Sequence, residues 1–325
     1  MKKRYWLGLV LLLMMTLVWL PGCGSNGEST TADQPKEAQP AVESEAWTPV
    51  EITDALDQKL VIEQEPKRIV STIPSNTEIL FALGAGSKVV GVSDWDNYPE
   101  EVTSITKIGG IDLNIEGIMA LAPDLVFAHQ SSATAWADGL EQLRQAGINV
   151  VVVNDATSFD EVYRSIEMVA QAIGEPTEGE QLVTSMKEQF AEIEKKAASI
   201  PENERPKVWV EISEDLYTAG SGTFIDEMLK LLHANNIAGD QAGWFQLNEE
   251  DVIVRQPDII LSTYGYYVPN AKELILARTG WGHIPAIQSG QVYDVDSDMV
   301  TRPGPRLVDG VIEMAKVLYP QLFNE

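Results

Sequence analysis

The sequence predicts an α/β protein of two lobes, with central, largely parallel sheets joined by one long helix and a ligand cleft between the lobes. Three observations support this prediction. Apolar runs of strand length alternate with helical patterns along the chain, which is typical of a parallel sheet covered on both faces. A pattern of strand and helix signals occurs twice. One stretch, 177–199, keeps a helical period without a proline.

The repeated pattern reads LNIEGIMALAPDLVFAH at 113–129 and LNEEDVIVRQPDIILST at 247–263. Each copy predicts a short helix capped by its Asn, with Glu116 or Glu250 in the first turn, where the helix dipole favours an acid. Pro-Asp then ends the helix, and an apolar run predicts a strand. We interpret the copies as two lobes built on one plan. The alternative is that ordinary α-β units look alike.

The first 22 residues are expected to be a lipoprotein signal peptide. Three basic residues at 2–4 precede an apolar run that ends at Leu20. Cys23, the only cysteine in the chain, is the expected lipidation site, although Pro21 departs from the usual small residue. An uncleaved membrane anchor is the alternative, but the apolar run is short for a spanning helix. We therefore expect an extracytoplasmic protein anchored to the cell membrane through lipidated Cys23.

Residues 23–46 are rich in Gly, Ser, Thr, Pro and Glu and predict a flexible tether. Without residues 1–22 the chain has 20 Lys and Arg against 49 Asp and Glu, a net charge of −29. Such a surface repels nucleic acid, which we exclude as a partner. The remaining 303 residues suit two domains. We expect an N-terminal lobe at 47–175, a linking helix at 176–200 and a C-terminal lobe at 201–325.

The N-terminal lobe is expected to begin with a hairpin, because two short alternating runs flank a polar turn. An apolar strand at 68–72 follows, and then a helix to Gly84 with Ser75 or Asn76 as its cap. The two strands of the hairpin are expected at 50–53 and 60–63. The other expected strands of this lobe are 89–92, the strand of the first repeat to 128, and 149–153, and the other expected helices are 137–146 and 159–173.

The linking helix is predicted by apolar residues that recur at three- and four-residue steps from Leu182 to Ala197. At 1.5 Å per residue it would span roughly 35 Å, enough to join two lobes. Around the second repeat, the expected elements of the C-terminal lobe are strands at 207–212 and 291–295 and helices at 223–232, 271–277 and 306–318.

The sequence contains no motif that indicates catalysis: no GxSxG, no HExxH and no phosphate-binding loop. Its three histidines, His129, His233 and His283, are isolated, whereas a metal site needs clustered ligands. We therefore expect a protein that is not an enzyme and that has neither a cofactor nor a bound metal ion of its own.

Loops beyond the carboxyl ends of the strands hold many aromatic residues, which suit the walls of a cleft for a large, flat ligand. Trp95 and Trp136 lie in otherwise polar loops, which favours ligand contact, whereas core packing is an equal alternative for the others. Arg306 either contacts ligand or begins the last helix and pairs with a carboxylate. The candidate ligand-binding residues are Trp95, Tyr98, His129, Trp136, Tyr217, Trp244, Tyr264 and Arg302.

Three segments, PKRIVSTIPSNTEILFALGAG (66–86), GVSDWDNYP (91–99) and VTRPGPRLVDG (300–310), together with the two repeats, resemble the solute-binding lipoproteins of ABC importers for cobalamin, haem and ferric siderophores. The resemblance runs from about residue 47 to the C-terminus. Within this family, SNTEILFALG and the Trp-containing loop look most like the vitamin B12-binding members. The segment Gly109-Gly110-Ile111 departs from some of these, which have an aromatic residue there.

The resemblance implies a monomeric receptor that captures a corrinoid and delivers it to an ABC permease dimer with its ATPase subunits. Glu116 and Glu250 match the glutamates that dock each lobe onto the permease in this family, and the alternative is that each only stabilises its own helix. The ligand is expected to be a cobalt- or iron-containing chelate. A haem or ferric-siderophore binder is the alternative within the class, and a zinc- or manganese-binding importer protein or an extracellular enzyme are further alternatives.

Overall fold

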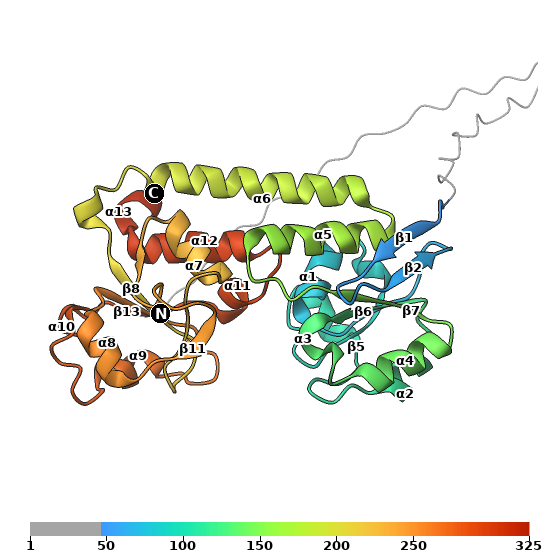
Figure 1. Cartoon of the computed structure of the whole chain (residues 1–325), viewed down its shortest axis with the longest axis horizontal. Coiled ribbons are helices and arrows are strands. Elements are labelled where there is room, and N and C mark those ends of the chain that lie inside the picture. The colour runs from blue at the N-terminus through green and yellow to red at the C-terminus, as the bar shows by residue number, and fades with distance from the viewer. Residues whose placement is uncertain (1–46, 325) are drawn as a thin grey trace, which may run out of the picture. The chain divides into compact units, whose positions relative to one another are not determined.

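Two parallel sheets, one in each lobe, organise residues 47–324, the part of the chain that this computed structural model describes (Figure 1). The expected signal peptide, the lipidation site Cys23 and the tether lie outside these residues. Among residues 47–324, no helix combines the length and the apolar character that crossing a membrane requires.

The N-terminal lobe contains a five-stranded parallel sheet in the order β5-β4-β3-β6-β7. Its side chains alternate between two apolar clusters, with Leu125 and Phe127 in one and Val126 and Ala128 in the other, because successive side chains of a strand point to opposite faces. The strands are β3 (Ile69–Ser71), β4 (Val89–Val92), β5 (Thr106–Lys107), β6 (Leu125–His129) and β7 (Asn149–Val153), and β1 (Val50–Thr53) and β2 (Lys59–Ile62) form an antiparallel pair.

The C-terminal lobe contains a four-stranded parallel sheet in the order β10-β8-β12-β13. Here Val210 and Leu261 belong to one apolar cluster, and Trp209 and Ile260 belong to the other. Its strands are β8 (Lys207–Glu211), β10 (Asn235–Asn236), β12 (Ile259–Ser262) and β13 (Val292–Asp294), and β9 (Tyr217–Ala219) pairs antiparallel with β11 (Trp244–Gln246).

The two repeats form the same structure in the two lobes. Helix α2 (Ile115–Ala120) is capped by Asn114, whose side-chain oxygen accepts from the N–H of Gly117 at 2.8 Å. Helix α8 (Glu249–Arg255) is capped in the same way by Asn248. These side chains satisfy N–H groups that a helix start leaves unpaired, so the predicted caps are confirmed.

The Pro-Asp pairs that follow these helices also match. The residues before each proline, Ala122 and Gln256, have positive φ angles of 45° and 50°, which end the helices. Oδ2 of Asp124 accepts from the N–H of Lys67 at 2.8 Å, just before β3. Asp258 accepts from the N–H of Lys207, at the start of β8, at the same distance. Each aspartate thus ties its strand to the neighbouring one, and the lobes follow one plan.

The long helix α6 (Pro176–Ala197) packs against both lobes. It contacts α5 (Phe159–Ile173) of the N-terminal lobe, where the rings of Phe159 and Phe190 stack at 4.5 Å, and it contacts α7 (Phe224–Leu231) and α12 (Leu307–Leu318) of the C-terminal lobe. One apolar cluster runs beneath α6 through both lobes. The predicted fold class, two α/β lobes joined by one long helix, is confirmed.

The cap predicted for the helix after β3 is wrong. Helix α1 (Pro74–Ala82) begins at the proline, which suits a first helical position because it has no N–H to satisfy. Ser75 and Asn76 are therefore inside the helix and buried, and Asn76 donates to the carbonyl of Ala128 at 3.2 Å. The remaining helices are α3 (Gln130–Ala133), α4 (Ala137–Gln145), α9 (Ala271–Leu276), α10 (Pro285–Ser289), α11 (Ser297–Thr301) and α13 (Pro320–Phe323), with short 3-10 helices at Gly86–Lys88, Glu100–Ser104 and Glu202–Glu204.

Candidate functional site

A cleft of about 940 Å³ lies between the lobes, at the large end of the usual range for small-molecule sites. It is built from loops that leave the carboxyl ends of β3, β4, β12 and β13, which is where open α/β sheets bind ligands. The N-terminal lobe contributes Ile73, Pro74, Ser75, Asp94, Trp95 and Asn97. The C-terminal lobe contributes Gly265, Tyr266, Asp294, Val295, Asp296, Ser297, Asp298, Thr301, Arg302 and Pro303.

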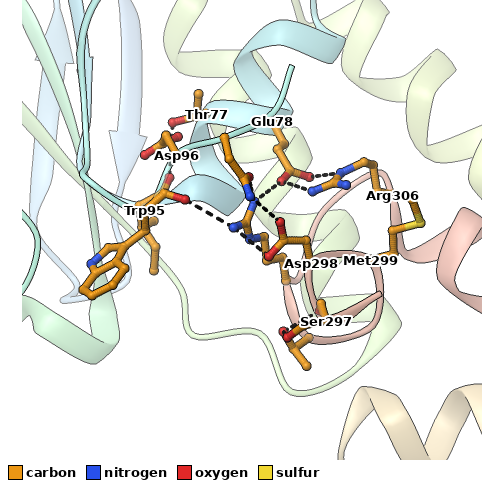
Figure 2. Close-up of polar contacts among 12 residues, drawn as sticks. Thr77, Glu78, Trp95, Asp96, Ser297, Asp298, Met299 and Arg306 are labelled. Atoms are coloured by element: carbon orange, nitrogen blue, oxygen red, sulfur yellow. Dashed lines mark hydrogen bonds and ion pairs between the residues drawn. The ribbon is translucent and has the colours of Figure 1, made fainter. Parts of the chain in front are cut away.

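Beside the cleft, a buried ionic network joins the lobes (Figure 2). Glu78 on α1 is 3 % exposed, and its carboxylate accepts two hydrogen bonds from Arg306, at 2.8 and 2.6 Å. Burial alone would lower the pKa of Arg306, but the bonds to Glu78 outweigh it and raise that pKa. The Arg306 guanidinium also lies 4.2 Å from the ring centroid of Tyr98, a cation–π contact.

Arg302 is the second cation of this network. Its Nη1 donates to Glu78 at 2.9 Å and to the side-chain oxygen of Asn97 at 2.8 Å. Its Nη2 donates to the carbonyl of Trp95 at 3.3 Å and pairs with Asp298 at 2.7 Å. Since both terminal nitrogens are already occupied, Arg302 lines the cleft without offering a free guanidinium edge to an anion.

The walls of the cleft are acidic. Of the described residues that line it, four are aspartates, Asp94, Asp294, Asp296 and Asp298, and the single cation is Arg302. Behind the C-terminal wall, burial raises the pKa of Glu313 in spite of a hydrogen bond from a backbone N–H, and the charges of Asp296 and Asp294 add to the rise. The cleft therefore has a negative field that favours neutral or cationic ligands over anions.

Two of the eight candidate ligand-binding residues line the cleft, Trp95 and Arg302. The Trp95 side chain is 57 % exposed, and Figure 2 shows its indole pointing away from the Glu78–Arg306 pair. Trp95 was predicted as a contact residue because it is a large aromatic residue in a polar loop, and it is indeed exposed. Arg306 has the structural role that was left open: it begins α12 and pairs with Glu78.

Two of the candidates are corrected to structural roles. Tyr264 is buried, and its hydroxyl donates to Glu211 at 2.5 Å beneath the loop that enters the cleft. Burial also raises its pKa, and the Glu211 charge adds to the rise. His129 is buried at the end of β6, with Nδ1 2.8 Å from the Ser131 hydroxyl, and burial lowers its pKa. The polar group of each side chain thus bonds to a residue of its own lobe.

The other four candidates are not among the residues that line this cleft. Tyr98 lies against Arg306. Trp136 packs on the N-terminal core and donates to the carbonyl of Ile111 at 3.0 Å. Trp244 packs edge-on against Phe224, and Tyr217 is a partly exposed residue of β9. Tyr98, Tyr217 and Trp244 were selected as aromatic residues near strand ends, and Trp136 was selected from its polar loop. Neither signal says which way the ring turns.

Several cleft residues were missed by the sequence reasoning. Asp294 ends β13, Asp296 follows it by two positions, and Asn97 follows Trp95 by two positions. The alternation of strands and loops could have indicated them, because polar residues directly after a strand of a parallel sheet lie at its carboxyl edge. Glu78 carried no such signal, because its two arginine partners lie more than 220 positions along the chain.

Glu116 and Glu250 occupy equivalent positions in the two lobes. Both are exposed and lie in the first turn of α2 or α8. Figure 1 shows these two helices along one edge of the described residues, away from α6. On α8, Glu250 is accompanied by Glu249 and Asp251. The arrangement presents a carboxylate on each lobe at the same edge.

The described residues contain no group of three or more His, Cys, Asp or Glu side chains that could hold a metal ion.

Known proteins with a similar sequence and a similar fold include a protein family, individual relatives and solved structures. A model of the periplasmic binding protein family matches residues 69–299. An uncharacterized ABC transporter substrate-binding lipoprotein of Bacillus subtilis (strain 168) is 46% identical over an alignment of 327 positions that covers 100% of each chain. A cobalamin-binding protein of Halobacterium salinarum is 27% identical over 298 residues, 89% of this chain and 79% of its own.

Among solved structures, a possible iron-binding periplasmic solute-binding protein of Staphylococcus epidermidis ATCC 12228 matches with a TM-score of 0.72 and 36% identity. The match covers 79% of this chain and 100% of the other. The similarity therefore extends over both lobes rather than one.

Proposed function

Because the chain belongs to the periplasmic binding protein family, we propose that its cleft captures a corrinoid, which the protein delivers to an ABC permease. The family match and the solved structure of the same fold confirm the family and the fold class that the sequence predicted. The protein is the substrate-binding component of an ABC transporter, not an enzyme, so its partners are a permease and ATPase subunits.

The observation that carries the choice of ligand is the charge of the cleft. Its single cation, among the described lining residues, is occupied by Glu78 and Asp298, while four aspartates line the same space. An anionic chelate such as haem, with its two carboxylates, would meet uncompensated negative charge. A corrinoid is large, flat and edged with amides, so Trp95 suits its face and the carboxylates suit its N–H groups.

The exposed glutamates supply the proposed contact with the permease. Glu116 and Glu250 lie on equivalent helices of two equivalent lobes. A permease dimer presents each contact twice, so one carboxylate on each lobe can meet one basic residue on each permease subunit. We also propose that Cys23 carries the lipid that holds the protein at the cell membrane, since it directly follows the predicted signal peptide.

An iron chelate is the second candidate, because the Staphylococcus epidermidis structure that covers both lobes is described as possibly binding iron. The acidic cleft restricts that candidate to a ferric siderophore without net negative charge. The test is quenching of tryptophan fluorescence by cyanocobalamin, cobinamide, haemin and a panel of ferric siderophores. Saturable quenching by the corrinoids supports the proposal, and saturable quenching by a siderophore without any response to corrinoids refutes it.

Replacement of Trp95 by alanine is expected to weaken binding of cyanocobalamin by roughly 1–3 kcal/mol, the usual loss when an aromatic anchor is truncated. The indole lines the cleft, is largely exposed and can cover one face of a flat ligand. Titration calorimetry measures the change. Tyr217→Ala is the matched control, because Tyr217 is a partly exposed aromatic outside the cleft lining. Equal effects of the two substitutions would contradict the role of Trp95.

A further inference from the structure

Two glycines each leave space that a side chain of the cleft occupies, one in each lobe. A Cβ on Gly110 would lie 2.9 Å from Nε1 of Trp95 and 3.1 and 3.2 Å from Cε2 and Cζ2 of the same ring. The indole therefore lies against Gly110 and fills the space that a side chain at this position would need. Any larger residue at 110 would push the ring out of this place, since these separations are shorter than ordinary contacts.

The second glycine, Gly265, lies against Asp294. Oδ1 of Asp294 accepts from the Ser262 hydroxyl at 2.7 Å and from the N–H of Gly265 at 2.9 Å. A Cβ on Gly265 would overlap this carboxylate. Both hydrogen bonds reach Oδ1, so they fix the orientation of the group, and Oδ2 lies over the Cα of Gly265 in the space that a Cβ would fill.

Neither glycine is required by its own backbone. Positive φ angles occur at eight other glycines of the described residues, but not at Gly110 or Gly265. Alanine can therefore adopt the backbone conformation at both positions, and only the neighbouring side chain opposes it. The missing Cβ atoms thus serve the positions of Trp95 and Asp294 rather than the turn of the chain.

We infer that Gly110 and Gly265 are specificity-determining residues of the cleft. Gly110 leaves room for the indole ring of Trp95 on the N-terminal wall of the cleft. Gly265 leaves room for the oriented carboxylate of Asp294 on the C-terminal wall. Together they select a flat ligand whose edge carries N–H donors and reject the same flat shape with carboxylates at its edge. This inference rests on the proposed function, because it specifies which chemical feature of a corrinoid the cleft recognises.

The selection follows from what each wall can do. The indole gains by covering a flat apolar face, whatever the edge of the ligand carries. The oriented carboxylate discriminates between edges, because an amide N–H donates to it whereas a ligand carboxylate adds a second negative charge. Preorganisation makes both contacts stronger, since neither side chain has to be ordered when the ligand binds.

The test compares cyanocobalamin with dicyanocobyrinic acid, a corrinoid that has carboxylates in place of the side-chain amides and lacks the nucleotide loop, so the discrimination is assigned from the change that each variant makes in the preference. Titration calorimetry is applied to the wild type, Gly110→Ala, Gly265→Ala and Asp294→Asn. Gly282→Ala is the matched control, because a Cβ there meets nothing within 4 Å. Gly110→Ala and Gly265→Ala are each expected to weaken binding of cyanocobalamin about tenfold, the size of one lost anchor or charged hydrogen bond, while Gly282→Ala leaves it unchanged.

The preference between the two corrinoids separates positioning from general stability. The wild type is expected to prefer cyanocobalamin by about a hundredfold or more, and Asp294→Asn and Gly265→Ala to reduce that preference about tenfold. Gly110→Ala should weaken both ligands equally and shift the tryptophan emission. Unaltered affinities and preferences in these variants, in a protein that binds cyanocobalamin, overturn the inference alone. A wild type that binds neither corrinoid overturns the proposed function, and the inference with it.

Discussion

A protein with both Glu116 and Glu250 replaced by lysine is expected to bind its ligand normally and to support no uptake. Both side chains are exposed, and neither is among the residues that line the cleft, so folding and ligand affinity should stay near wild type. Each lysine would place a positive charge against the basic residue proposed on the permease. A like-charge contact at such an interface costs several kcal/mol, enough to prevent docking.

Uptake of labelled cyanocobalamin by cells and calorimetry on the purified protein measure the two halves of this prediction. The double variant should be more severe than either single variant, and docking on permease in vesicles should weaken with salt, because exposed charges are screened. Glu192→Lys on α6 makes the same charge change at an exposed site on another helix. Normal uptake by the double variant, or lost affinity in the purified protein, would refute the docking assignment.

Substitution of Glu78 by alanine is expected to lower the free energy of unfolding by roughly 3–5 kcal/mol, the usual cost of removing one partner from a buried ion pair. Glu78 is 3 % exposed and accepts hydrogen bonds from two arginines, Arg302 and Arg306. Without it, two guanidinium groups would remain between the lobes without their carboxylate. Denaturant unfolding of the purified protein, followed by circular dichroism, measures the loss.

The matched control for this prediction is Glu65→Ala. Glu65 also pairs with two cations, Lys67 and Lys88. The hydrogen bond from Lys67, and to a smaller extent the one from Lys88, lower its pKa to about 2. Its side chain is 37% exposed, so solvent screens these pairs and the expected loss is about 1 kcal/mol or less. An unfolding curve for Glu78→Ala that coincides with that of Glu65→Ala would show that the interlobe network adds no more than a surface pair.

The fold could be predicted from the sequence because its signals are local. In each repeat, an Asn cap, a Pro-Asp stop and an apolar run lie within seventeen residues, so each signal acts on its immediate neighbours. The prediction of the α1 cap was wrong because two local signals competed: Ser75 favours a cap position and Pro74 favours the first helical position. The proline occupies the first helical position, so the helix begins one residue before Ser75. The long helix was evident because its apolar period continues over several turns.

The site was predicted less completely, because its contacts are long-range. Trp95 was found from its loop, but the same kind of signal selected Tyr264, whose ring turns inward to meet Glu211. No sequence pattern relates Glu78 to Arg306, or Gly110 to the ring of Trp95, since these pairs are joined only by the packing of the folded chain. Local propensity fixes the elements, whereas the side chains that face the cleft depend on tertiary packing.

Direct competition between two coloured ligands tests the central claim, that the acidic interlobe cleft captures a corrinoid. The purified protein is mixed with equimolar cyanocobalamin and haemin, each in excess over the protein, and passed over a gel-filtration column while visible absorbance is recorded. The protein peak is expected to carry the corrinoid spectrum at about one ligand per chain and no haem Soret band, because the cleft lacks a free cation for carboxylates. A protein peak that carries haem, or neither ligand, would contradict the account.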